Sequence, residues 1–258
     1  MLDQGNSESV EKRRTAFQED LKFAERRTVD TRSGVSSYAE AFNLSDEELI
    51  KLMRQRTTLD LGSGPGLLGA QLALLGLREN NPNLFPVDSL NIRFASPNYR
   101  EGDLVSELES LAIDPNPSEI EQAIRIAKRH RLSYSWHDLS DIPSNKYDNI
   151  LSLWGFPCYS DFGHIFFPKK NEDDEIASNK LKFGSESKVV FKQLIRLLKP
   201  SGIMLLHNGF NIIQWNQDVG MHEEFARFFA QQGVQAQVLV ARQLGSHPGS
   251  FTKIIKSL

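Results

Sequence analysis

The sequence predicts an α/β fold, in which a mostly parallel sheet carries helices on both faces and ends in an antiparallel hairpin. Three observations predict it. An apolar strand, a glycine cluster and an apolar helix follow one another over residues 57–77, which is the opening of a parallel α/β unit. Strand-like and helix-like segments then alternate along the chain. The last two strands, 234–240 and 251–255, are separated by a connection too short for a crossover helix, so they pair antiparallel.

The N-terminal segment is polar and helical in pattern, and its periodicity breaks at residues 31–37, where glycine and serines gather. We therefore expect residues 1–44 to form a helical cap or appendage, and residues 45–258 to form the core domain.

The first core elements are justified by capping and apolar signals. Ser45, followed by Glu48, forms a capping box that begins a short amphipathic helix. Residues 57–61 are apolar or β-branched and stop at glycines, which is typical of a buried strand. The helix over 67–77 is apolar almost all round, so it is predicted to be buried.

The second strand has two alternative positions. In the first, residues 84–87 form the strand and Asp88 ends it, although Pro86 lacks the N–H that an interior strand position donates. In the second, the strand is 91–95 and no acid follows it. We favour the first.

The remaining elements follow from periodicity and from flanking turn residues. They are a helix from Pro117, strands at 132–136 and 148–153, a helix at 189–198, a strand at 203–206, a helix containing 225–229, and the final hairpin strands.

Composition limits the classes of function. The chain has 258 residues with 30 Lys and Arg against 33 Asp and Glu, and its pI near 6.1 does not indicate a nucleic-acid partner. Cys158 is the only cysteine, which excludes an internal disulfide and favours a reducing compartment. Residues 1–28 are charged throughout, so we expect no membrane anchor and a cytoplasmic location. The histidines lack partners at metal-ligand spacing, so no metal site is predicted.

The glycine cluster is the most informative motif. Gly62, Gly64 and Gly66 occupy alternate positions after a buried strand, where a ligand can approach bare backbone, and the following helix points its positive end at the same place. The dinucleotide fingerprint needs glycine at its sixth position, which is Leu67 here, so this spacing disfavours NAD.

Three stretches of the chain, 59–66, 137–152 and 196–202, resemble in order and spacing the motifs of the class I S-adenosylmethionine-dependent methyltransferases. The resemblance covers 45–258. It implies a Rossmann-like, seven-stranded sheet whose last strand is antiparallel, which agrees with the hairpin. Residues 1–44 resemble no family that we can name.

The resemblance also implies roles for individual residues. The glycine turn holds the methionine part of the cofactor, Asp60 lies near its ammonium group, Asp138 contacts the adenine, and an acid after the second strand, for which Asp88 is the candidate, accepts the ribose hydroxyls. The residues implied to contact S-adenosylmethionine are Tyr38, Asp60, Gly62, Ser63, Gly64, Gly66, Asp88, His137, Asp138, Leu139, Ser152, Leu153 and Trp154. Structural alternatives stay open: a turn-stabilising role for Asp60, a surface or capping role for Asp138, and packing for Tyr38 and Trp154.

Methyl transfer is an in-line displacement that sometimes needs a proton acceptor. His207 and Tyr159 follow predicted strands at the edge where ligands bind, so they are the candidate catalytic residues, although a structural role for His207 is the alternative. The long connection 160–187 is a candidate lid.

The sequence therefore favours an S-adenosylmethionine-dependent methyltransferase whose acceptor and oligomeric state it does not identify. The alternatives are a non-catalytic protein that binds S-adenosylmethionine or S-adenosylhomocysteine, and a nucleotide-dependent oxidoreductase, which the glycine spacing disfavours.

Overall fold

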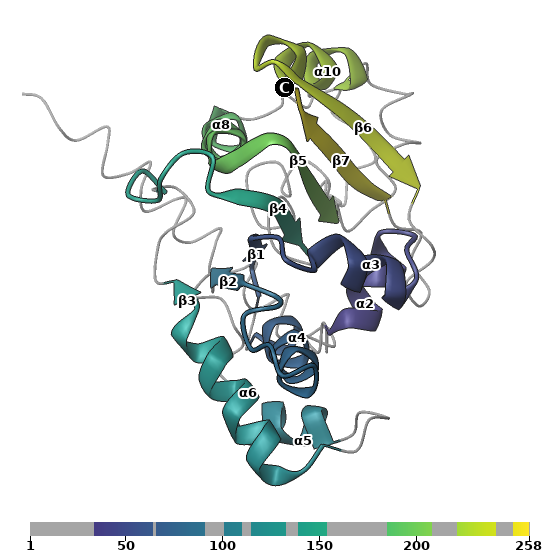
Figure 1. The fold of residues 1–258 in the computed structure, drawn as a ribbon. Helices are drawn as coiled ribbons and strands as arrows, with labels where there is room; N and C mark the ends of the chain where they lie inside the picture. The colour runs from purple at the N-terminus through teal and green to yellow at the C-terminus, as the bar shows by residue number, and fades with distance from the viewer. Residues whose placement is uncertain are drawn as a thin grey trace, which may run out of the picture.

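The centre of the molecule is a seven-stranded sheet (Figure 1). The computed structural model describes residues 34–63, 66–90, 101–109, 115–132, 139–153, 185–207, 221–240 and 250–257, and the sheet order within them is β3-β2-β1-β4-β5-β7-β6. Its strands are β1 (Thr58–Leu61), β2 (Val87–Leu90), β3 (Arg131–Leu132), β4 (Tyr147–Ser152), β5 (Leu198–His207), β6 (Val234–Val240) and β7 (Ser250–Lys256). Strand β7 runs antiparallel to both β5 and β6, whereas the pairings among β1 to β5 are parallel. The predicted fold is confirmed.

Helices cover both faces of the sheet, as predicted. They are α2 (Val35–Ala41), α3 (Asp46–Met53), α4 (Leu67–Arg78), α5 (Glu101–Glu109), α6 (Pro117–Arg129), α8 (Ser185–Leu197) and α10 (Met221–Gln231). Side chains of α8 and α10 share one core cluster with the sheet, and side chains of α2, α3 and α4 share a second cluster on the opposite face. Within the described ranges, none of these helices has both the length and the apolar character that crossing a bilayer requires.

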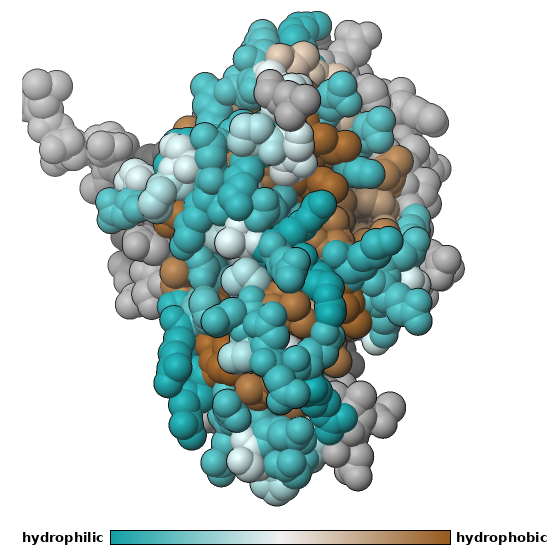
Figure 2. Space-filling view, in the orientation of Figure 1, coloured by the Kyte–Doolittle hydropathy of each residue, from teal (hydrophilic) through white to brown (hydrophobic). Residues whose placement is uncertain are grey.

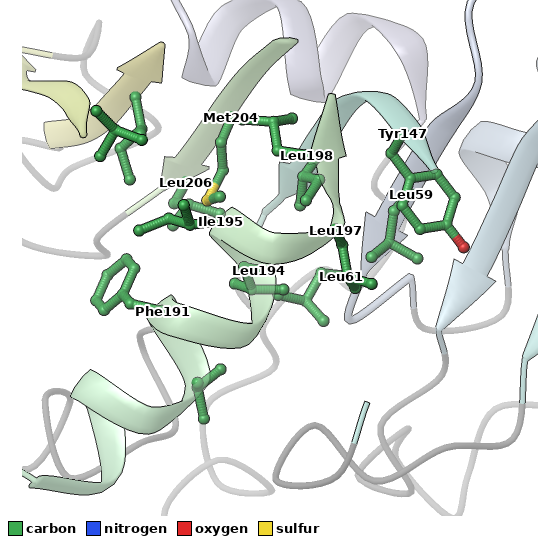
Figure 3. Close-up of a cluster of buried hydrophobic side chains, with 14 of the residues drawn as sticks. Leu59, Leu61, Tyr147, Phe191, Leu194, Ile195, Leu197, Leu198, Met204 and Leu206 are labelled. Carbon is green, nitrogen blue, oxygen red and sulfur yellow. The ribbon is translucent and has the colours of Figure 1, made fainter. Parts of the chain in front are cut away.

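Strand β1 is buried on both faces because it lies between these two clusters. Leu59 and Leu61 point into the cluster beneath α8, where Figure 3 shows them facing Leu194 and Leu197. Successive strand side chains point to opposite faces, so Asp60 points to the other face, towards α2. A fully buried acid therefore stands in the centre of the sheet.

The capping box that begins α3 is present as predicted. The Ser45 hydroxyl accepts a hydrogen bond from the Glu48 backbone N–H at 3.1 Å, and the Glu48 carboxylate accepts one from the Ser45 N–H at 2.7 Å. Together they satisfy two backbone donors that the helix itself leaves without partners.

We expect Ser45→Ala to lower the free energy of unfolding by about 1 kcal/mol, because one helix-terminal N–H loses its acceptor. Urea denaturation at pH 7 measures the loss. Glu48→Gln is the matched control, since glutamine also serves in a capping box. An equal loss in both variants would contradict this account.

The predicted break at 31–37 is wrong for its described part, because α2 begins at Val35. Tyr38, Ala39 and Phe42 are buried in the cluster that α3 and α4 complete. Serines mark turns in sequence, but here Ser36 bonds the Asp46 carboxylate of α3 at 2.7 Å and Ser37 lies within the helix. The described part of the expected cap therefore packs against the core.

The described second strand overlaps the first predicted position, 84–87, only at Val87, and the second predicted position, 91–95, lies outside the described residues. Strand β2 is Val87–Leu90, with Asp88 as its second residue rather than its end. Pro86 precedes the strand, and its carbonyl accepts a hydrogen bond from the Thr58 N–H at 3.0 Å. Because this contact needs no donor from Pro86, the proline fits immediately before the strand.

Other elements differ from prediction. Helix α5 was not predicted, and the described part of β3 begins at Arg131, one residue before the predicted start at 132. Strand β5 begins at Leu198, immediately after α8, because Leu198 pairs with Tyr147 before the ladder resumes at Ile203. The turn residues 199–202 therefore form an irregularity within the strand and not a loop before it.

Candidate functional site

The glycine turn joins the carboxyl end of β1 to α4. Gly62 and Gly66 have φ values of +85° and +87°, which lie in the left-handed region that side chains disfavour. The Gly62 N–H donates to the Leu90 carbonyl at 2.9 Å, which ties the turn to β2. Gly66 is the N-cap of α4 and provides no side-chain acceptor, so the positive end of this helix has no cap from its own sequence.

Asp60 is fully buried beside this turn, at the carboxyl end of β1. Its Oδ1 accepts a hydrogen bond of 2.5 Å from the Tyr38 hydroxyl, and its Oδ2 has no hydrogen-bond partner among the described residues. Burial raises the pKa of Asp60 to about 7, although the Tyr38 hydrogen bond opposes the rise. The structure therefore brings together Tyr38 and Asp60, two of the residues predicted separately to contact the cofactor.

Tyr38 connects three elements. It lies on α2, donates to Asp60 of β1, and interacts through its hydroxyl with the backbone of Leu153, which follows β4. Burial and the neighbouring Asp60 raise the pKa of Tyr38 well above its usual value, so this hydroxyl is a donor at every physiological pH. The orientation of the Asp60 carboxylate is set by this contact.

Three serine hydroxyls surround the same edge of the sheet. Ser63 lies in the glycine turn, Ser89 on β2 in register with Asp60, and Ser152 at the end of β4. All three are buried, and within the described ranges their Oγ atoms have no hydrogen-bond partner. Buried hydroxyls almost always have partners, and leaving one without costs about 1–3 kcal/mol. Ser89 is in register with Asp60 and points to the same face of the sheet, and together with the Ser63 hydroxyl of the turn this pair fits a site for a polar ligand.

Sequence reasoning missed Ser89. Its Oγ lies 3.9 Å from the position a Cβ would take at Gly66 and 3.5 Å from that at Gly69, so it faces the glycine turn and the start of α4. In the structure, Ser89 is recognised by its register with Asp60. In the sequence this register was concealed, because the second strand was placed incorrectly.

His207 ends β5 at the same edge of the sheet and pairs with Phe251 of β7. The side chain is buried, and burial lowers the pKa of His207 to about 4. The ring is therefore neutral at pH 7 and only weakly basic.

Asp88 lies away from the glycine turn, contrary to its predicted ribose-binding role. It is in register with Leu59, and its carboxylate contacts Lys146 Nζ at 2.6 Å, the Tyr147 hydroxyl at 2.9 Å and His130 Nδ1 at 3.2 Å. These partners precede or begin β3 and β4, so Asp88 belongs to the edge where the parallel strands start. It is not brought together with Asp60, and we do not propose it as a ligand-binding residue.

We expect Asp88→Asn to lower the free energy of unfolding at pH 7 by about 1–2 kcal/mol without changing ligand affinity, because a half-exposed ion pair and its hydrogen bonds are lost. The hydrogen bonds from Lys146 and Tyr147 outweigh desolvation and lower the pKa of Asp88. The stabilisation by the Asp88 carboxylate is therefore present above its pKa in the unfolded chain, near 3.9, and is lost as pH falls through its lower pKa in the folded chain. Urea titrations at pH 7 and pH 3 test both statements.

Asp141→Asn is the control for this prediction, because Asp141 is exposed on the loop before β4. A tenfold weaker affinity for S-adenosylhomocysteine in Asp88→Asn, with Asp141→Asn unchanged, would restore Asp88 to the ligand site.

Leu139 has both backbone polar groups engaged by α8. Its N–H donates to Gln193 Oε1 at 2.6 Å, its carbonyl accepts from Arg196 Nη2 at 2.6 Å, and its side chain is buried in the core. Leu139 was implied to contact S-adenosylmethionine, but its backbone N–H is therefore not available for such a contact.

Several predicted residues lie outside the described ranges, together with residues 160–184 of the candidate lid, whose last three residues begin α8. They are Gly64, His137, Asp138, Trp154, Cys158 and Tyr159. Within the described ranges, no three His, Cys, Asp or Glu side chains gather in a way that would hold a metal ion.

No protein-family model and no curated protein matches this chain. Solved structures do match it, and three methyltransferases among them illustrate the similarity. The 16S rRNA (adenine(1408)-N(1))-methyltransferase from Catenulisporales acidiphilia is 11% identical with a TM-score of 0.45, and the match covers 88% of this chain and 94% of that one. The antibiotic-resistance methyltransferase Kmr is 12% identical with a TM-score of 0.44, covering 83% and 92%. The aminoglycoside resistance methyltransferase NpmB1 is 15% identical with a TM-score of 0.41, covering 83% and 94%. With TM-scores below 0.5, these similarities assign neither a function nor a substrate.

Proposed function

We propose that this chain is a class I S-adenosylmethionine-dependent methyltransferase. The observation that carries the proposal is the buried Asp60 carboxylate, one oxygen of which has no partner among the described residues. It stands beside a glycine turn and the uncapped positive end of α4. A negative group and a positive helix end side by side complement a zwitterion, and the amino-acid end of S-adenosylmethionine is one.

The residues present fit this cofactor. Asp60, oriented by Tyr38, would accept hydrogen bonds from its ammonium group, and the first backbone N–H groups of α4 with the Ser63 hydroxyl would donate to its carboxylate. Gly62 and Gly66 allow the close approach. The pyrophosphate of NAD fits less well, because its negative charges would lie beside the Asp60 carboxylate.

When bound, the cofactor supplies an electrophilic methyl group on a sulfonium centre. The chain's own contribution is to align the acceptor and to exclude water. Tyr38 closes the site from the α2 side. His207 and Tyr159 remain proposed catalytic residues. The neutral ring of His207 accepts a hydrogen bond from an acceptor group more readily than it removes a proton from one, since burial lowers its pKa to about 4.

Calorimetric titration at pH 7.5 tests the proposal. We expect S-adenosylmethionine and S-adenosylhomocysteine to bind with micromolar dissociation constants, and NAD not to bind. Micromolar binding of NAD alone would overturn the proposal in favour of an oxidoreductase.

A second experiment separates an enzyme from a binding protein. Incubation with S-adenosylmethionine carrying a labelled methyl group, followed by fractionation of a cell extract into RNA, protein and small molecules, is expected to label one fraction. Asp60→Asn is the matched control and should leave that fraction unlabelled. Binding of the cofactor without label in any fraction would favour the non-catalytic alternative.

A further inference from the structure

A hollow of about 350 Å³ lies between α6 and the loop that precedes β2. Its polar lining comes from Asn83, Ser118, Glu121, Arg125, Arg129 and His130. Asn83 comes shortly before β2, and His130 immediately precedes β3. The hollow is therefore at the edge where the parallel strands start, whereas the glycine turn is at the edge where β1 ends.

The surface around the hollow is basic, although the whole chain has a net charge of −3. Residues 121–131 contain four exposed basic side chains and a single acid, Glu121. In Figure 2 strongly hydrophilic side chains line the outer side of α6, at the lower left. Positive charge is concentrated here to an extent that the overall composition does not show.

Two arginines in the hollow have no partner. Arg125 and Arg129 lie one turn apart on α6, and neither has a hydrogen bond or ion pair in the described part of the chain. Like charges at this spacing destabilise a helix by about 0.2–0.5 kcal/mol. Arg129 is in the last turn, where the helix dipole favours a cation, but Arg125 is not. The stability of α6 therefore does not explain why two arginines occur at this spacing.

The nearby acids leave this charge largely uncompensated. Asp88 is engaged by Lys146, Tyr147 and His130, as described above. Glu121 is four residues before Arg125, at a spacing that partly offsets one arginine. Arg129 has no such acid at this spacing, because the residue four positions before it is Arg125.

We infer that this hollow binds phosphate groups. Two guanidinium groups on one helix face present paired N–H donors that match phosphate oxygens. The Ser118 hydroxyl, in the first turn of the same helix, and the Asn83 amide, on the facing loop, add neutral donors. The phosphate comes either from a small phosphate compound or from the diester backbone of an RNA strand. This inference does not depend on the proposed function, since it concerns the opposite edge of the sheet.

Nuclear magnetic resonance with ¹⁵N-labelled protein tests the inference, with inorganic phosphate and a single-stranded RNA oligonucleotide as separate probes. We expect the backbone amide signals of Asn83 and Ser118 to shift in a saturable manner. In Arg125→Gln/Arg129→Gln the affinity should fall at least tenfold. If RNA is the source, the slope of log affinity against log salt should also become less steep by about 1.4, because two backbone contacts are removed.

Arg227→Gln is the matched control, because Arg227 is an exposed helical arginine on α10, remote from the hollow. Its affinities should equal those of the wild-type chain. Binding of phosphate but not of RNA would support the site with a small phosphate compound as its source. Absence of saturable shifts with both probes, or an equal loss in Arg227→Gln, would overturn the inference.

Discussion

Asp60→Asn is expected to be more stable than the wild-type chain at pH 8 and to lose at least a hundredfold in affinity for S-adenosylhomocysteine. The gain in stability follows from burial of the carboxylate, which raises its pKa from 3.8 to about 7. A shift of this size corresponds to about 4 kcal/mol between the two protonation states. Asparagine keeps an oxygen that accepts the Tyr38 hydroxyl and has no charge to desolvate.

The pH dependence has a definite sign. Because the folded pKa is above the unfolded one, the folded state holds its proton more tightly, and the wild-type chain is stabilised by Asp60 protonation only at low pH. Its free energy of unfolding should fall relative to that of Asp60→Asn as pH rises from about 4 to about 7, and the difference should stay constant above that range.

Urea denaturation of both proteins from pH 5 to pH 8 measures this difference, and calorimetry measures the loss of affinity. Removing one partner of a buried ion pair costs about 3–5 kcal/mol, which corresponds to the expected loss. Asp60→Ala is the contrast, since it leaves the Tyr38 hydroxyl without its acceptor and should be less stable than Asp60→Asn. Unchanged affinity in Asp60→Asn would remove this acid from the site.

The second large effect concerns the turn itself: Gly66→Val should abolish measurable binding and lower the free energy of unfolding by about 1–2 kcal/mol. The stability cost comes from the φ of +87°, which a β-branched residue rarely adopts. The nearest atom to a Cβ at this position is Ser89 Oγ, at 3.9 Å, so the Cβ itself makes no close contact with the protein. Loss of binding would therefore report that the ligand approaches this backbone.

Gly69→Ala is a sharp control for that experiment. Gly69 lies one turn along α4, and its Cβ would meet Ser89 Oγ at 3.5 Å, an ordinary contact without backbone strain. We expect it to bind normally and to be as stable as the wild-type chain or slightly more so. Full affinity in a folded Gly66→Val protein would show that the ligand binds elsewhere.

The elements that sequence predicted best are those whose signal is local. The β1 strand, the glycine turn and α4 follow from apolar periodicity and from glycines that the left-handed conformation requires. Tyr38 was expected to contact the cofactor, but its pairing with Asp60 was not predicted, because the two residues are 22 positions apart.

The features that were mispredicted or missed depend on distant contacts. Asp88 looks like a strand-ending acid in sequence, but its partners Lys146 and Tyr147 are 58 and 59 residues away, and they hold it at the other edge. The described part of strand β2 is as short as β1, but no glycine turn marks its end in the sequence as one marks the end of β1. Among the described residues the Ser89 hydroxyl has no partner, and this depends on how the sheet assembles, which no local sequence pattern shows.

The short helix α2 couples the N-terminal segment to the proposed cofactor site. A helix of seven residues is not stable alone, so its order depends on docking, through the Tyr38 contact and through a hydrogen bond from the Val35 N–H to Gln71 of α4 at 2.7 Å. Local opening of α2 would expose Asp60 to water. A ligand bound against Asp60 should therefore slow hydrogen exchange at the Phe42 amide, which bonds the Tyr38 carbonyl at 3.1 Å, although that amide never touches the ligand.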